Sequence, residues 1–356
     1  MKTGTATLPL HCGKAPRWLF SRMVKLARHI TVAVVEEYGA ARMLERLSDP
    51  FWFQAFGCVL GFDWHSSGLT TTVGGALKQG LRGIERELGF FVAGGKGATS
   101  RKTPEEIQQF CMKIALDPAH LVSSSRMSAK VDSAAVQDGF TLYHHNFFFT
   151  AKGEWCVVQQ GMNDALRDAR RYHWLGESVQ SMVCEPHAAV CCDVKGEGLN
   201  MVARESEQAR EVLAWLACQS PDKTVRELNT IGELRLPKRH HIVEAEDIDP
   251  KRLHRILIRT YDRQPEDFQT LLGMQGVGAK TIRALSLIGE LIHGARPSFR
   301  DPVRFSYAHG GKDGHPYPVN REVYDRSIQI LRSALEKSQI ERSERLQALK
   351  RLSLFY

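Results

Sequence analysis

The sequence contains no apolar run long enough to cross a bilayer, and its first residues, MKTGTATLPLHCGKAP, include no apolar segment of the kind that a signal peptide needs. Its eight cysteines form no C-x-x-C pair, which argues against a zinc ribbon. No internal repeat and no low-complexity segment is present. We therefore expect a cytoplasmic protein with reduced thiols and no membrane partner.

Acidic residues are fewer than basic residues, and this imbalance limits the kind of partner that we expect. Lys and Arg total 48 against 40 Asp and Glu, which gives a formal net charge of +8 and a sequence pI near 9.1. Such an excess favours a polyanionic partner such as a nucleic acid. Hydrophobic residues make up 43% and charged residues 25%, the balance of a folded globular protein.

The length of 356 residues predicts two domains. Residues 141–150 and 154–162 are rich in aromatic and β-branched side chains around a short turn, which predicts a β-hairpin. A further strand is expected within residues 187–194. We therefore predict an α+β fold, with a mixed α/β domain over residues 1–202 whose sheet contains this hairpin. Amphipathic helical patterns dominate afterwards and predict an all-α domain over residues 203–356.

The most informative segment joins two helical patterns in that second domain. Gly276-Val277-Gly278 is followed by Ala279, Lys280 and Thr281 at the start of an amphipathic run. Glycines let the backbone turn sharply and bring its N–H groups close to a ligand. The start of the following helix adds unpaired N–H groups and the positive end of the helix dipole. Such a place attracts phosphate.

This segment resembles the hairpin of the helix-hairpin-helix DNA-binding family, which grips the nucleic-acid backbone without reading bases. Gln275 stands where many members have proline. The alternative is a helix-to-helix turn whose glycines serve only packing. The resemblance implies DNA contacts through Gly276, Val277, Gly278, Lys280 and Thr281, and Arg283 is a further candidate for DNA binding. A charged loop after it either extends the basic surface or is simply solvated, with Arg300, Arg304, His309, Lys312 and His315 as its cations.

Polar side chains interrupt the apolar sequence of the first domain at four places, and such groups are costly to bury without partners. Three of these clusters lie within residues 63–68, 96–101 and 125–138, and the fourth is on the predicted hairpin. Because the hairpin turn is short, residues near positions 145 and 159 lie across from each other. One face of the sheet therefore presents a histidine beside a glutamine amide.

Phosphodiester cleavage needs an activated water or nucleophile, stabilisation of charge on the phosphate, and a proton for the leaving oxygen. Carboxylates and imidazoles of the first domain can bind Mg²⁺ or Mn²⁺ or act as a base, and its cations can hold the phosphate. The candidate catalytic residues are Asp63, His65, Arg126, Lys130, Asp132, Asp138, His145 and Gln160. No established nuclease signature is present, and the sequence fixes neither the metal nor its ligands.

Several long segments share a second resemblance. Among them are DPFWFQAFGCVLGFDWHSSG, SRMSAKVDSAAVQDG, YHHNFFF and AHGGKDGHPYPV, which together resemble the domain-of-unknown-function family numbered seven hundred and sixty-three. The resemblance runs over most of the chain. It implies a prokaryotic protein suspected of acting on DNA, and it assigns no role to any residue.

Three functions remain open. The first is a DNA nuclease with its chemistry in the first domain and backbone binding, with little base readout, in the second. The second is a DNA glycosylase or abasic-site lyase, in which the Lys280 amine forms a Schiff base with the sugar and Asp301 assists; the V-D-x-H pattern that should follow is missing. The third is a non-enzymatic DNA-binding protein. Each predicts association with the nucleoid, and each is compatible with a homodimer.

Overall fold

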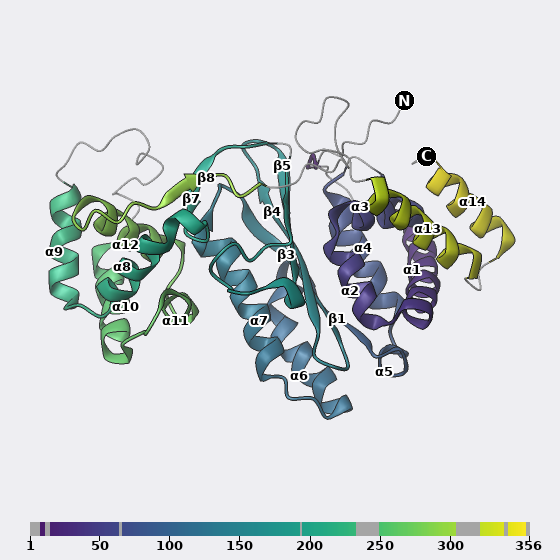
Figure 1. The fold of residues 1–356 in the computed structure, drawn as a ribbon, viewed down its shortest axis with the longest axis horizontal. Coiled ribbons are helices and arrows are strands. Elements are labelled where there is room, and N and C mark those ends of the chain that lie inside the picture. The colour runs from purple at the N-terminus through teal and green to yellow at the C-terminus, as the bar shows by residue number, and fades with distance from the viewer. Residues whose placement is uncertain are drawn as a thin grey trace.

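The computed structural model describes residues 8–10, 15–63, 66–192, 194–232, 249–303, 321–337 and 341–353, with the side chains of residues 321–327 left out (Figure 1). His65 therefore lies outside the described residues, and so do Arg304, His309, Lys312 and His315.

A five-stranded antiparallel sheet forms the centre of the molecule, in the order β1-β3-β4-β5-β6. Its strands are β1 Phe90–Lys96, β3 Thr141–Thr150, β4 Trp155–Asn163, β5 Asp168–Leu175 and β6 Ala189–Cys191. The predicted hairpin is confirmed as β3 and β4, in which His145 lies opposite Gln159. Side chains of successive strand residues point to opposite faces, so the aromatic run on β3 supplies both faces of the sheet.

Helices cover both faces of this sheet (Figure 1). One face packs in a hydrophobic core with the N-terminal helices, and Phe90, Val92 and Phe148 belong to this core. The other face, with Phe91 and Phe147, packs against α6 and α7. The N-terminal helices are α1 Arg17–Tyr38, α2 Ala40–Ser48, α3 Pro50–Leu60, α4 Gly68–Gly80 and the short α5 Glu85–Leu88, and the second group is α6 Thr103–Ile114 and α7 Ala119–Lys130.

A π-helical turn, η2 Val131–Ala135, extends α7 and leads into β2 Val136–Gln137. Strand β2 pairs with β7 Glu197–Asn200, which pairs in turn with β8 Ser298–Arg300. The second expected domain is therefore not purely helical, because β8 completes a small sheet with strands from the first. Its helices are α8 Glu207–Ala217, α9 Pro221–Gly232, α10 Pro250–Arg263, α11 Phe268–Gly273 and α12 Ala279–Leu291.

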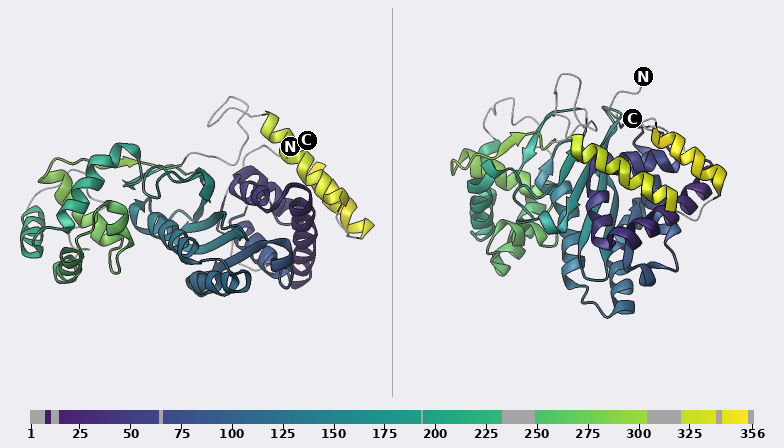
Figure 2. Two further views of the ribbon diagram at one scale, coloured as in Figure 1. Left: turned by 60° about the horizontal axis from the view of Figure 1, so that its bottom comes forward. Right: turned by 45° about the vertical axis from the view of Figure 1, so that its right-hand side comes forward.

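The last two helices return to the opposite end of the molecule. Helices α13 Arg321–Lys337 and α14 Arg342–Leu352 pack against α1 and α3 (Figures 1 and 2). Leu331, Leu335 and Leu352 are buried in the core that the N-terminal helices form. The expected unit of residues 203–356 thus does not stay together, because the apolar faces of its last helices are buried on the first domain. The α+β class itself is confirmed.

Candidate functional site

The turn between α11 and α12 uses its two glycines in different ways. Gly276 has a φ of +93°, in the left-handed region that favours glycine. Gly278 caps α12 with an extended backbone, and a Cβ there would meet no atom within 4 Å. Gly276 is exposed, whereas the Val277 side chain is fully buried. The turn therefore shows glycine backbone to solvent while one apolar side chain anchors it.

A cavity of about 350 Å³ opens beside this turn, and we call it the hairpin cavity. Its cations are Arg252 and Lys280, both exposed. Its acidic residue, Asp249, accepts a hydrogen bond of 2.9 Å from the backbone N–H of Lys251 and so caps α10. The remaining lining residues are Leu253, Ile256, Gly276, Gly278, Ala279 and Thr281. Of the residues expected to contact DNA, those that line this cavity are Gly276, Gly278, Lys280 and Thr281.

Side chains of the α7–β2 segment hold the α11–α12 turn, which we call the hairpin from here on, against the first domain. The Lys130 ammonium donates hydrogen bonds to the backbone oxygens of Val277 and, at 3.5 Å, Met274. Gln137 donates to the backbone oxygen of Ala279 at 2.9 Å, and its own side-chain oxygen accepts from Arg283 at 2.8 Å. Lys130 and Arg283, expected at a phosphate, thus have contacts that hold the two domains together. Burial lowers the pKa of Lys130.

A larger cavity, of about 770 Å³, lies between α7 and β3, and we call it the α7 cavity. Ser125, Arg126 and Lys130 line it from α7, and His145 lines it from β3. Arg101 adds a second exposed guanidinium. No Asp or Glu is among the described residues that line it. The cavity therefore favours an anionic occupant.

A chain of hydrogen bonds leads from this cavity into the core. The Ser125 hydroxyl lies 3.0 Å from His145 Nε2, and His145 Nδ1 lies 2.7 Å from Gln159 Oε1. The Gln159 amide donates to a carboxylate oxygen of Asp132 and, at 3.0 Å, to the Ser128 carbonyl. Burial lowers the pKa of His145, and the hydrogen bond that His145 donates to Gln159 and the Asp132 charge offset this only in part. The imidazole is therefore neutral at pH 7.

Asp132 is fully buried in the π-helical turn and is the centre of a second set of contacts. His187 Nε2 lies 2.5 Å from its Oδ1, and Trp174 Nε1 donates to its Oδ2 at 3.0 Å. The structure thus joins two predicted catalytic residues, Asp132 and His145, through Gln159. It also gives Asp132 several donors, so its role toward a substrate is indirect.

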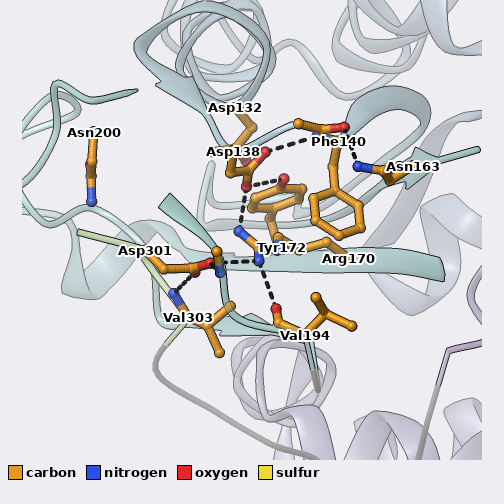
Figure 3. A network of polar contacts seen from close by, with 12 residues as sticks. Asp132, Asp138, Phe140, Asn163, Arg170, Tyr172, Val194, Asn200, Asp301 and Val303 are labelled. Atoms are coloured by element: carbon orange, nitrogen blue, oxygen red, sulfur yellow. Dashed lines mark hydrogen bonds and ion pairs between the residues drawn. The ribbon is translucent and has the colours of Figure 1, made fainter. Parts of the chain in front are cut away.

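Asp138 belongs to a separate buried network (Figure 3). Its Oδ2 accepts hydrogen bonds from Arg170 at 2.7 Å and from the Tyr172 hydroxyl at 2.8 Å. Arg170 also donates to Asp301 at 2.9 Å and to the Val194 carbonyl at 3.0 Å. Both carboxylates therefore neutralise one guanidinium that is only 1% exposed. Asp301, which a Lys280 lyase would need, belongs to this network and does not line the hairpin cavity.

Gln160 lies on the opposite face of the sheet from His145. Its amide nitrogen donates to the Ser67 carbonyl at 3.0 Å and to the Tyr143 hydroxyl, and its oxygen accepts from Thr70 of α4. The structure thus separates His145 and Gln160, which were expected in one site. His145 lies opposite Gln159, and the next residue on β4, Gln160, points to the other face of the sheet.

Asp63 is exposed after α3, and its sequence neighbour His65 is outside the described residues. Among the residues that the structure describes, no three His, Cys, Asp or Glu side chains are grouped to hold a metal ion.

Sequence reasoning missed Ser125 and His187 as members of the site. Ser125 belongs to the polar cluster of residues 125–138 but is not among the candidate catalytic residues, and His187 is 55 residues from Asp132, its partner. The alternation of side chains along β3 and β4 was the one signal that placed His145 beside a glutamine, and it applies to Gln159.

A family model with the description "protein of unknown function (DUF763)" matches residues 4–319. Neither a curated protein nor a solved structure matches the chain. Of the helices in the described ranges, none combines the length and the apolar character that a bilayer span requires.

Proposed function

The chain belongs to the DUF763 family, whose description gives no activity, and we propose from its own residues that it is a DNA-binding nuclease. In this proposal the hairpin grips the phosphate backbone of DNA in the helix-hairpin-helix manner, with little base readout. The α7 cavity then receives the phosphodiester that is cleaved.

The observation that carries the proposal is the alignment of the hairpin cavity with a stripe of arginines on α10. Arg252, Arg255, Arg259 and Arg263 are all exposed, and their spacing of three or four residues places them along one side of the helix. Arg252 lines the hairpin cavity, and an Arg259 nitrogen lies 3.9 Å from the position of a Cβ on Gly276. Their Cα atoms span roughly 16 Å, the rise of about five base pairs.

Glycine backbone, the start of α12 and these guanidiniums together suit a run of phosphates better than a single small anion. Backbone N–H groups at the start of a helix receive one phosphate. Arginines repeated along a helix contact further phosphates of the same strand and make binding strongly dependent on salt. A neutral or basic partner would leave these positive charges without compensation.

Binding is tested by the fluorescence anisotropy of a labelled duplex titrated at several KCl concentrations. We expect Lys280→Glu to weaken binding. The slope of log K against log[salt] is negative, and its magnitude should decrease by about 0.9 for each phosphate that the variant no longer neutralises. The matched control is Lys152→Glu, which makes the same charge change at the exposed β3–β4 turn. Equal affinity and equal slopes for the two variants and the unmodified protein would show that the hairpin is not the contact.

Cleavage is tested with supercoiled plasmid and with labelled duplex, single-stranded and branched DNA. Each substrate is incubated with Mg²⁺, with Mn²⁺ and with a chelator, because a divalent metal is the second expected source of charge stabilisation on the phosphate. Absence of cleavage in every arm would reject the nuclease, and salt-sensitive binding would then favour a non-enzymatic DNA-binding protein. Borohydride trapping on abasic DNA tests the lyase alternative, which requires an adduct at Lys280.

A further inference from the structure

The α7 cavity contains a serine beside a histidine in the arrangement of an activated nucleophile. Ser125 lies in the interior of α7, where a serine hydroxyl commonly bonds the backbone of its own helix. Here the hydroxyl instead lies 3.0 Å from His145 Nε2 on β3. Both residues line the cavity, and their exposed fractions are 3% and 6%. The pair is therefore largely shielded from bulk water but open to an occupant of the cavity.

The surrounding hydrogen bonds fix which nitrogen of His145 carries the proton. The Asp132 carboxylate and the Ser128 carbonyl are both acceptors, so they require the NH₂ group of Gln159 on their side. This orientation turns Gln159 Oε1 toward His145 Nδ1, which must then be the donor. The remaining nitrogen, Nε2, carries no proton and accepts a hydrogen bond from the Ser125 hydroxyl.

Gln159 and Asp132 thus act as positioning residues. Gln159 holds the ring of His145 in one orientation and one tautomer, and Asp132 holds the amide of Gln159. The second carboxylate oxygen is occupied by His187 at 2.5 Å, so the carboxylate itself is held in place as well. Orientation of a base by a third group is the general requirement for activating a hydroxyl nucleophile.

We propose that Ser125 is the nucleophile of this protein and that its substrate is a phosphate ester, with His145 as the base. The choice of a phosphate ester rests on the proposed nuclease function and on the charges at the cavity. Arg101 and Arg126 line it, and no carboxylate among the described lining residues competes with an anion there. A neutral acyl ester would offer these two guanidiniums no negative charge to bind.

The reaction balances in two steps. Ser125 Oγ gives its proton to His145 Nε2 and forms a bond to phosphorus, while the bond from phosphorus to the leaving oxygen breaks and that oxygen takes the proton from His145. Water then gives a proton to His145 Nε2 and attacks phosphorus. The bond from phosphorus to Ser125 Oγ breaks, and Oγ regains its proton. No redox partner is required.

A fluorophosphonate probe tests the nucleophile without any DNA. The probe forms a phosphorus ester with an activated serine and releases fluoride, and the adduct is located by peptide mass spectrometry. We expect labelling at Ser125 in the folded protein, no labelling in Ser125→Ala, and a loss of about 10²–10⁴-fold in rate for His145→Asn, the range for removal of a general base. Ser123→Ala is the matched control, because Ser123 is an exposed serine of α7 in the same cavity.

The pH profile separates a positioning role of Gln159 from a structural one. In the unmodified protein, the rate of labelling should decrease as the pH falls and His145 takes up a proton. The midpoint of this decrease should lie below pH 6.5, because burial lowers the pKa of His145. Gln159→Leu should shift this midpoint, since it removes the acceptor of the Nδ1 proton, whereas a merely structural change would scale the rate at every pH. A profile of unchanged midpoint would overturn the assignment of Gln159.

The two proposals fail separately. Labelling of Ser125 without cleavage of any DNA would support the nucleophile and reject the nuclease. Cleavage retained by a folded Ser125→Ala variant would support the nuclease and overturn the nucleophile. Absence of a Ser125 adduct in the folded, unmodified protein would also overturn the nucleophile, and an adduct formed only with acylating probes would overturn the phosphate ester.

Discussion

Replacing His144 by phenylalanine should remove a defined part of the sensitivity of this fold to acid. His144 lies on β3, on the sheet face that packs against the N-terminal helices, and only 1% of it is exposed. Neither ring nitrogen has a hydrogen-bond partner among the described residues. Burial, followed by the nearby charges of His145, Lys96 and Arg171, lowers its pKa from 6.5 to about 3.

The direction in which stability changes with pH follows from proton uptake by His144. Below pH 6.5 the unfolded chain takes up a proton at His144 and the folded protein does not, so stability falls as the pH decreases and this loss continues until about pH 3. One such group removes about 2 kcal/mol from the free energy of unfolding between pH 7 and pH 5, with a limiting slope of about 1.4 kcal/mol per pH unit. His145 and His173, whose pKa values burial also lowers, add losses of their own.

Urea unfolding at pH 7, 6 and 5 measures the effect. The absolute stability of His144→Phe is not the test, because the change of packing shifts it at every pH. The test is the free energy of unfolding of His144→Phe minus that of the unmodified protein. This difference should rise by about 2 kcal/mol from pH 7 to pH 5. His120→Phe, at an exposed position, is the control and should run parallel to the unmodified protein. A parallel curve for His144→Phe would refute the reasoning.

Two further substitutions, each with a control, test buried contacts by urea unfolding. Asp301→Asn should cost about 1.5–3 kcal/mol, because it removes a charge-assisted contact to the buried Arg170; Glu205→Gln, in an exposed ion pair, should cost under about 1 kcal/mol, and equal costs would contradict the assigned burial. Gly74→Ala should cost about 1–3 kcal/mol, because its Cβ would stand 1.6 Å from a side-chain amide nitrogen of a buried β3 residue. Gly75→Ala meets only ordinary contacts at 3.6 Å and should stabilise α4 by about 0.5–1 kcal/mol, and a reversed order would exclude the close approach at Gly74.

Local patterns in the sequence predicted the structural features that depend on residues close together in the chain. Aromatic and β-branched residues around a short turn were enough to predict β3 and β4, and the turn length also predicted that residues near positions 145 and 159 lie across from each other. The same alternation of side chains placed one of two adjacent glutamines beside His145. It could not identify which, because a shift of one residue moves every side chain of a strand to the other face.

Contacts between distant residues were not predictable in this way. Arg170 joins Asp138 to Asp301, which is 131 positions away, and no periodicity links these three residues. The return of α13 and α14 to α1 and α3 was missed for a similar reason. An amphipathic helix shows in its sequence that it has an apolar face, but the partner of that face depends on the whole fold.

The segment from Ser125 to Gln137 connects the two cavities, and Lys130 shows how the connection can be measured. Lys130 was expected to hold a phosphate, yet its ammonium bonds the hairpin carbonyls of Met274 and Val277. If the protein binds DNA as proposed, Lys130→Met should loosen the hairpin and weaken DNA binding without removing a phosphate contact. We expect a lower affinity with an unchanged salt slope, whereas Lys280→Glu lowers both. A slope that falls by about 0.9 in Lys130→Met would instead show that this ammonium leaves the carbonyls and contacts DNA itself.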